Sequence, residues 1–144
     1  MTPLRHAALQ ELALKVLAQR TGSATEVGAV AAAARQAYDD LAHVSSPLIG
    51  HVGVDALTAR ALHLARQQYS WLGDADEPEP ANEPFAQALA RLARQDPAVA
   101  IEGAAAVFAM LTGLLVTFIG EPLTAVLMRK AWPDVFSDVC KEEM

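Results

Sequence analysis

Residues 103–120 read GAAAVFAMLTGLLVTFIG, an uncharged run of 18 residues between Glu102 and Glu121. The run holds nine large apolar side chains. Each is worth roughly 1.5–3 kcal/mol on burial, so exposing them all would cost on the order of 15–25 kcal/mol. A helix surrounded by water is therefore excluded. The run must be sheathed by other helices or lie in a bilayer, because its rise of about 27 Å is close to a hydrocarbon core of about 30 Å.

Two features favour a bundle core over a bilayer. Acidic residues flank the run, and no lysine or arginine lies near either end to mark a membrane boundary. Ala105, Ala109, Gly113 and Thr117 recur every four residues and form one smooth face that lets a neighbouring helix approach closely. We therefore expect the chain's own amphipathic helices to enclose this run.

Helix start and stop signals divide the rest of the chain. A capping box at 23–26 begins a helix that we expect to end at Ser45-Ser46-Pro47, because proline disfavours helical geometry in the preceding residue. Gly50 and Gly53 weaken the turns that follow, which predicts a short helix or bend to about residue 52. The other helices are expected over 3–20, 54–69, 84–95, 97–120, 121–132 and 134–140. This pattern predicts one all-α domain, a bundle of six or seven helices around a central apolar helix.

Composition and charge limit the classes of partner. The chain has 144 residues, a size typical of one domain, and its net charge of −6 disfavours binding to nucleic acid. Residues 73–84 read GDADEPEPANEP and predict an acidic, Pro-rich loop. Hydrophobic residues make up 53% and charged residues 19%, which leaves little polar cover and predicts an exposed apolar surface. We expect this surface to bind another protein or a second copy of the chain. A membrane is the less favoured partner.

No catalytic or cofactor signature is present in the sequence. The four histidines lie outside zinc-binding spacings, and we expect neither a metal nor a cofactor. His51 and Asp55 are four residues apart and are interpreted as a surface ion pair. The single cysteine, Cys140, allows no internal disulfide and is consistent with the cytoplasm.

Residues 42–57, AHVSSPLIGHVGVDAL, are similar in outline to the phosphoacceptor helix of histidine phosphotransfer domains. Gly53 and Leu57 stand where that family often has a glycine and an apolar residue. The resemblance implies that His43 accepts a phosphoryl group. It departs from the family at Ser46 and Pro47, where lysine and glycine are usual.

At the level of fold, an apolar central helix wrapped by amphipathic helices resembles the bundles of Bcl-2-type and colicin-type pore formers. That resemblance implies a soluble protein that inserts the 97–120 helix into a membrane when triggered. It rests on architecture alone, because the diagnostic motifs of those families are not found in this chain.

The preferred interpretation is a non-enzymatic cytoplasmic protein, interacting or regulatory, that works through helix-mediated association as a homodimer. Large side chains near the acidic loop and the C-terminus are the predicted contacts, since such residues contribute most to interface energy. These candidates are Leu57, Leu64, Tyr69, Trp71, Trp132 and Phe136.

Overall fold

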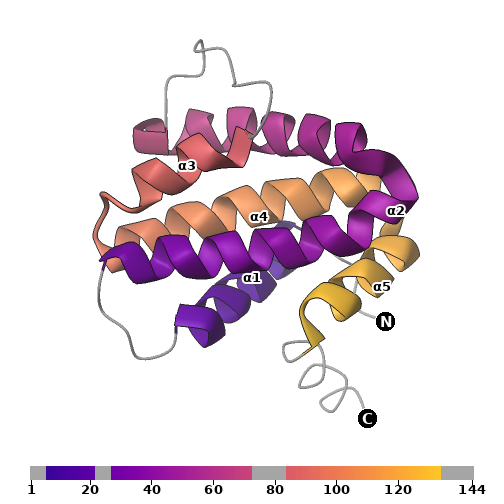
Figure 1. Cartoon of the computed structure of the whole chain (residues 1–144), viewed down its shortest axis with the longest axis horizontal. Coiled ribbons are helices and arrows are strands. Elements are labelled where there is room, and N and C mark those ends of the chain that lie inside the picture. The colour runs from indigo at the N-terminus through magenta and orange to yellow at the C-terminus, as the bar shows by residue number, and fades with distance from the viewer. Residues whose placement is uncertain (1–5, 22–26, 73–83, 134–144) are drawn as a thin grey trace.

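A computed structural model of the chain describes residues 6–21, 27–72 and 84–133 (Figure 1). The described residues are helical, which confirms the all-α class. They form five α-helices and one 3-10 turn: α1 (His6–Thr21), α2 (Val27–Gln68), η1 (Ser70–Leu72), α3 (Pro84–Leu92), α4 (Pro97–Ile119) and α5 (Glu121–Ala131). The capping box at 23–26, the acidic segment 73–83 and the expected last helix at 134–140 lie outside the described residues.

The predicted helix end at Ser45-Ser46-Pro47 is wrong. Helix α2 continues through Pro47 and bends at Gly50, whose φ of 80° and ψ of 161° are not helical. Glycine takes this positive φ without steric cost, so the bend falls three residues after the proline. The two predicted helices therefore separate at Gly50 rather than at Pro47, within the bend predicted to about residue 52, and α2 has two arms; the count of six or seven helices is not confirmed.

Helix α4 lies at the centre of the bundle, between α1 and the two arms of α2 (Figure 1). From Ala104 to Ala109 every side chain is buried, and Leu111 and Leu115 are buried further along. On the face of small residues, Gly113 lies next to α1 as predicted, and a side-chain methyl of Leu9 is its nearest neighbour there. The enclosure of α4 is thus confirmed over most of its length.

Four aromatic rings join the elements that surround α4. The ring of Tyr38 on α2 stacks on Phe85 of α3 at 4.4 Å between centroids, and Phe85 packs at a tilt against Phe108 of α4. Phe108 meets Trp132, which follows α5, edge to face at 5.8 Å. These rings tie four segments that are distant in sequence into one core.

The two arms of α2 are linked by a buried hydrogen bond. The hydroxyl groups of Tyr38 and Thr58 lie 3.0 Å apart across the bend, and the Thr58 hydroxyl donates to the carbonyl of Val54 at 2.8 Å. The Tyr38 hydroxyl therefore donates to Thr58. Burial is the main cause that raises the pKa of the Tyr38 phenol.

We expect Tyr38→Phe to lower the free energy of unfolding by about 1 kcal/mol at neutral pH, because one buried hydrogen bond is lost. A phenol with a raised pKa in the folded state favours folding while it is protonated. This contribution is lost as the pH rises above about 10, where the unfolded phenol ionises first. Urea unfolding from about pH 9 to about pH 11 should show a smaller loss of stability in Tyr38→Phe than in the wild type. Equal losses in both proteins would contradict this account.

Candidate interaction surface at the bend of α2

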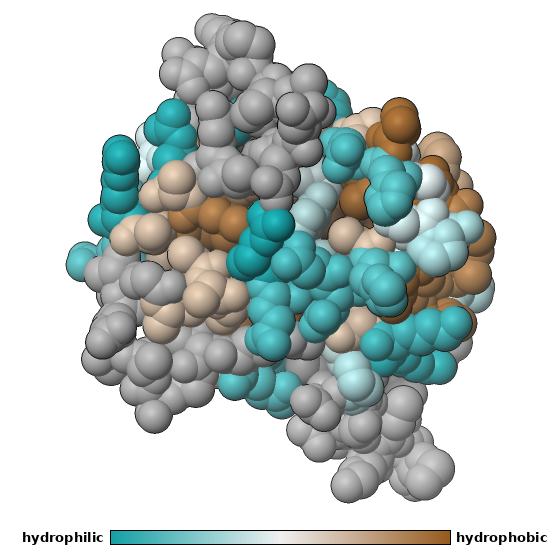
Figure 2. Space-filling view, viewed as in Figure 1, coloured by the Kyte–Doolittle hydropathy of each residue, from teal (hydrophilic) through white to brown (hydrophobic). Residues whose placement is uncertain are grey.

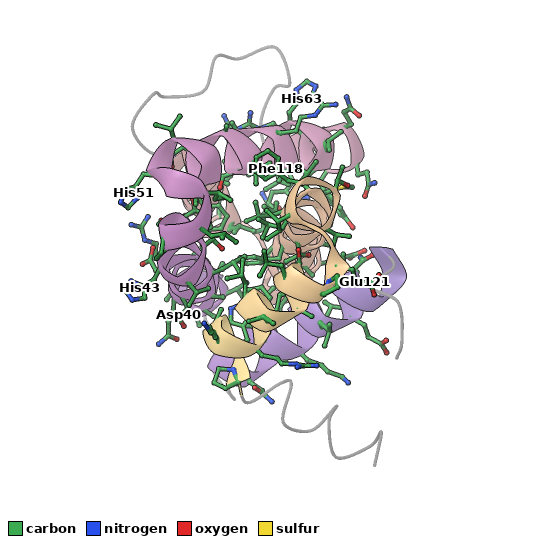
Figure 3. All side chains as sticks on the ribbon, turned by 90° about the vertical axis from the view of Figure 1, so that its right-hand side faces the viewer. Asp40, His43, His51, His63, Phe118 and Glu121 are labelled. Carbon is green, nitrogen blue, oxygen red and sulfur yellow. The ribbon has the colours of Figure 1, made fainter. Side chains whose placement is uncertain are left out.

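Large apolar side chains are exposed at one end of the bundle, where the bend of α2, the last turn of α4 and the first turns of α5 lie together (Figures 1 and 3). Val52 is 84% exposed, Phe118 65% and Leu48 48%. Figure 2 shows apolar surface at this right-hand end and a second apolar area left of the centre, with hydrophilic residues between them. We call this surface the apolar end and define it by Leu48, Val52, Phe118, Leu123 and Val126.

The local structure explains why these residues face water. Gly50 turns α2 sharply, so Leu48 and Val52 on either side of it project from the outside of the bend. At the end of α4, Gly120 takes a φ of 93° and starts α5 directly, which leaves Phe118 in the last turn without a covering helix. The expectation that Phe118 is enclosed with the rest of α4 is therefore wrong, because the covering helices turn away before α4 ends.

Few charges lie at the apolar end. His51 lies on the bend of α2 and Glu121 opens α5; in Figure 3 they lie on opposite sides of the view, with Phe118 above both. Helix α4 has no ionisable side chain after Glu102.

The imidazole of His51 has a defined partner. Its Nδ1 lies 3.3 Å from the hydroxyl oxygen of Ser46, and that hydroxyl donates to the carbonyl of Ala42 at 2.8 Å. Because the Ser46 proton is used in this way, Nδ1 of His51 is the donor to Ser46. His51 thus pairs with Ser46 in this structure, and the predicted ion pair with Asp55 is not formed.

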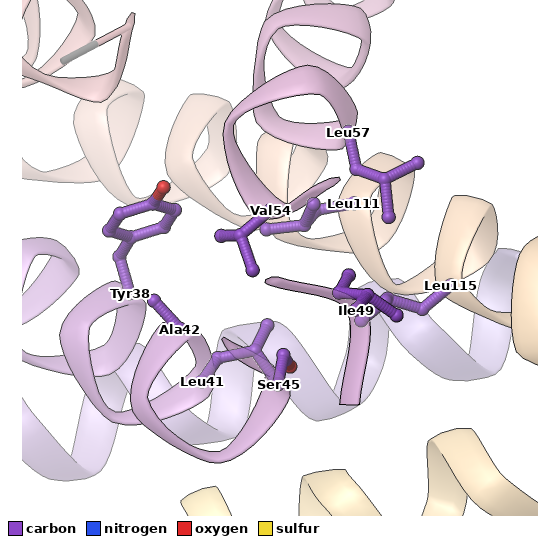
Figure 4. Close-up of a pocket in the computed structure, with 9 residues that line it drawn as sticks. All are labelled: Tyr38, Leu41, Ala42, Ser45, Ile49, Val54, Leu57, Leu111 and Leu115. Atoms are coloured by element: carbon purple, nitrogen blue, oxygen red, sulfur yellow. The ribbon is translucent and has the colours of Figure 1, made fainter. Parts of the chain in front are cut away.

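A narrow cavity lies between the arms of α2 and α4 (Figure 4). The space open to the centre of a water molecule is about 10 Å³, and the buried hydroxyl of Ser45 has no hydrogen-bond partner there. This space suits one water molecule rather than an organic substrate, since ligand sites typically measure about 300–1,000 Å³. The cavity is lined by Tyr38, Leu41, Ala42, Ser45, Ile49, Val54, Leu57, Leu111 and Leu115.

A second, wider hollow of about 660 Å³ runs along the outer side of the first arm of α2. It is open to solvent, and its charged members include Arg35 and Asp39, which form an ion pair at 3.2 Å. This pair is local to one helix. It therefore does not supply the buried, converging polar groups that are typical of an active site.

His43 is exposed on the first arm of α2, within a continuous helix rather than at a helix end. Phosphoryl transfer requires the accepting histidine to be exposed on a helix, and His43 meets this requirement. However, Asp39 and Asp40 precede His43 by one turn, so a phosphoryl group there would lie beside two carboxylates and be repelled. The phosphotransfer role of His43 stays a prediction, to be tested by whether phosphoryl label enters the wild type and not His43→Gln.

The predicted contact residues lie in different places. Trp132 is buried, and its indole N–H donates to the carbonyl of Ala37 at 3.2 Å. Leu57 and Leu64 are partly buried on the second arm of α2, and Leu57 lines the cavity. Tyr69 donates a hydrogen bond to Glu102 at 3.3 Å, and Trp71 packs over Gly103. Phe136 lies outside the described residues.

The apolar end was not among the residues selected from the sequence. Its members lie in four separate turns, and each belongs to a helix whose pattern reads as ordinary core. The one available signal was Gly50 followed by Val52, a glycine bend next to an apolar residue. Only the fold shows that this bend lies beside the last turn of α4 (Figure 3).

In the described part of the chain, no group of three or more His, Cys, Asp or Glu side chains is placed to hold a metal ion. The Ala98–Ile119 helix is long and apolar enough to span a membrane. An 18-residue window of this helix has a mean hydropathy of 2.1, and 61% of the window is buried in the bundle. A core helix of a soluble protein meets the same criteria.

No family model, curated protein or solved structure significantly matches this chain.

Proposed function

We propose that this protein is a non-enzymatic interaction protein of the cytoplasm that associates with a second copy of itself through the apolar end. The observation that carries the proposal is the exposure of Val52, next to the bend of α2, and of Phe118, in the last turn of α4. Hydrophobic surface of this kind on a soluble protein marks a contact site. The small cavity and the local ion pair of the open hollow support a binding role rather than catalysis.

The area of the apolar end suits a weak dimer. Its five side chains expose on the order of 500 Å², comparable with the largest patches on ordinary monomers. Two copies that covered this surface on each other would bury on the order of 1,000 Å² in total, the lower limit for a specific interface. The proposal therefore predicts a reversible dimer rather than an obligate one.

We expect Phe118→Ser to weaken self-association by at least about tenfold, because an exposed aromatic ring is the largest apolar group of the surface. Sedimentation velocity over a dilution series from micromolar to millimolar protein measures the effect. Val99→Ser is the matched control, since Val99 is 37% exposed at the opposite end of the same helix. It should leave the dimer unchanged.

Two results would count against the proposal. A wild type that stays monomeric at millimolar concentration would remove its basis. Equal weakening by Phe118→Ser and Val99→Ser would show that association does not use the apolar end. Circular dichroism of each variant confirms that the fold is retained.

A membrane is the second candidate partner, favoured by the length and hydropathy of the Ala98–Ile119 helix. The bundle would have to open for this helix to insert, since most of it is buried. Flotation with neutral and anionic liposomes, at neutral and acidic pH, tests this function. Binding that needs Phe118 would favour the membrane, whereas no binding under any condition would eliminate it.

A further inference from the structure

The narrow cavity between the arms of α2 and α4 has two hydroxyl groups among its lining residues (Figure 4). The hydroxyl of Tyr38 is bonded to that of Thr58. Ser45 is 2% exposed, and its hydroxyl has no hydrogen-bond partner among the described residues. A buried hydroxyl without a partner destabilises a folded protein, so such groups almost always bond to the protein or to ordered water. The hydroxyl of Ser45 therefore calls for a partner from solvent.

The fold explains why no side chain supplies this partner. Ser45 lies near the end of the first arm of α2, five residues before the bend at Gly50. The cavity residues of the second arm and of α4 are all apolar, namely Val54, Leu57, Leu111 and Leu115. The next serine along the helix, Ser46, bonds to the carbonyl of Ala42, but Ser45 has no such bond to its own helix.

We infer that this cavity is a binding site for one water molecule, held by the hydroxyl of Ser45 on the inner side of the α2 bend. The space of about 10 Å³ open to the centre of a water molecule is the smallest that holds one. A backbone carbonyl has two lone pairs and uses one in the helix, so carbonyls of the first arm can accept a second bond from the water. An apolar molecule would leave the hydroxyl of Ser45 unbonded.

The site joins three parts of the fold. Its wall includes Leu41 of the first arm, Ile49 beside the bend and Val54 of the second arm, and α4 completes it. A bound water fills the space in which the two arms diverge, so it supports the bend from the inside. The inference concerns this inner side and goes beyond the proposed function, which concerns the outer side of the same bend.

Ser45→Ala distinguishes a hydrated cavity from a dry one by the sign of its effect. In a hydrated cavity the substitution removes the main bond to the water, and we expect the folding equilibrium constant to fall on the order of threefold. In a dry cavity it would remove an unpartnered hydroxyl, and the constant would rise. Alanine is also the better helix former, so a fall cannot come from helix propensity. Urea unfolding measures the change.

Val54→Ile tests the water itself while Ser45 is kept. The added methylene occupies the cavity and should displace the water, because the space holds only one molecule of that size. Magnetic relaxation dispersion of the water oxygen counts long-lived internal water molecules and does not respond to hydroxyl protons. We expect the wild type to exceed Val54→Ile by one water. Val99→Ile is the matched control, since Val99 is 37% exposed on α4 and the same change there should leave the dispersion unaltered.

Two results would overturn the inference. One is a higher folding equilibrium constant in Ser45→Ala than in the wild type. The other is equal dispersion in the wild type and Val54→Ile, with circular dichroism showing that the variant is folded. If Val54→Ile does not fold, the dispersion of Ser45→Ala decides, because it should lose the same water. Equal dispersion in that variant and the wild type would also overturn the site.

Discussion

Trp132→Ala should lower the free energy of unfolding by about 3–5 kcal/mol, the typical cost of removing a large aromatic side chain from a core. Trp132 is 2% exposed, meets Phe108 edge to face and bonds to the carbonyl of Ala37, 95 residues away in the sequence. It therefore holds the end of α5 against both α2 and α4. Urea unfolding followed by far-ultraviolet circular dichroism measures the loss.

Trp132→Phe distinguishes the contribution of ring packing from that of the indole hydrogen bond. Phenylalanine keeps most of the packing against Phe108 but cannot donate to Ala37, so we expect a smaller loss of about 1–2 kcal/mol. The remaining Trp71 reports unfolding by fluorescence in both variants. A loss below about 1 kcal/mol in Trp132→Ala would show that this contact is not part of the core.

Gly103→Ala should destabilise the protein by about 2 kcal/mol, even though alanine is the better helix former. A Cβ atom at position 103 would lie 2.4 Å and 2.5 Å from two carbons of the Trp71 ring, so the indole must leave its place on α4. Thermal and urea unfolding both measure this change. The expected net loss of stability is the cost of displacing the Trp71 indole minus the gain from the higher helix propensity of alanine.

Gly113→Ala is the matched control on the same helix. A Cβ atom there would meet only a methyl group of Leu9 at 3.8 Å, an ordinary contact. We expect a gain of about 0.5–1 kcal/mol, because alanine restricts the unfolded chain more than glycine does. Equal effects of the two substitutions would contradict the close packing of Trp71 on Gly103.

The sequence was sufficient to predict where the core lies. An uncharged run with nine large apolar residues allows few structures, and Pro97 and Gly120 bound α4 in the structure as they do in the sequence pattern. The ends of α5 were predicted for similar reasons, from Glu121-Pro122 and Trp132-Pro133. Strong local signals at both ends of a helix leave little for tertiary contacts to decide.

The position of the bend in α2 was harder to predict because a local signal competes there with tertiary packing. Pro47 disfavours helix in the residue before it, whereas packing of both arms against α4 favours a continuous helix with one break. The break falls at Gly50, the residue that reaches a positive φ at least cost. The apolar end depends on this choice, since the direction of the second arm determines what covers Phe118.

Self-association through the apolar end is tested most directly by intermolecular nuclear Overhauser effects. The sample is an equimolar mixture of isotope-labelled and unlabelled protein at millimolar concentration. The account predicts intermolecular contacts from the Phe118 ring to side chains of the apolar end of the second copy. Intermolecular contacts that involve Val99 or α1 and leave out Phe118, or none at all, would contradict it.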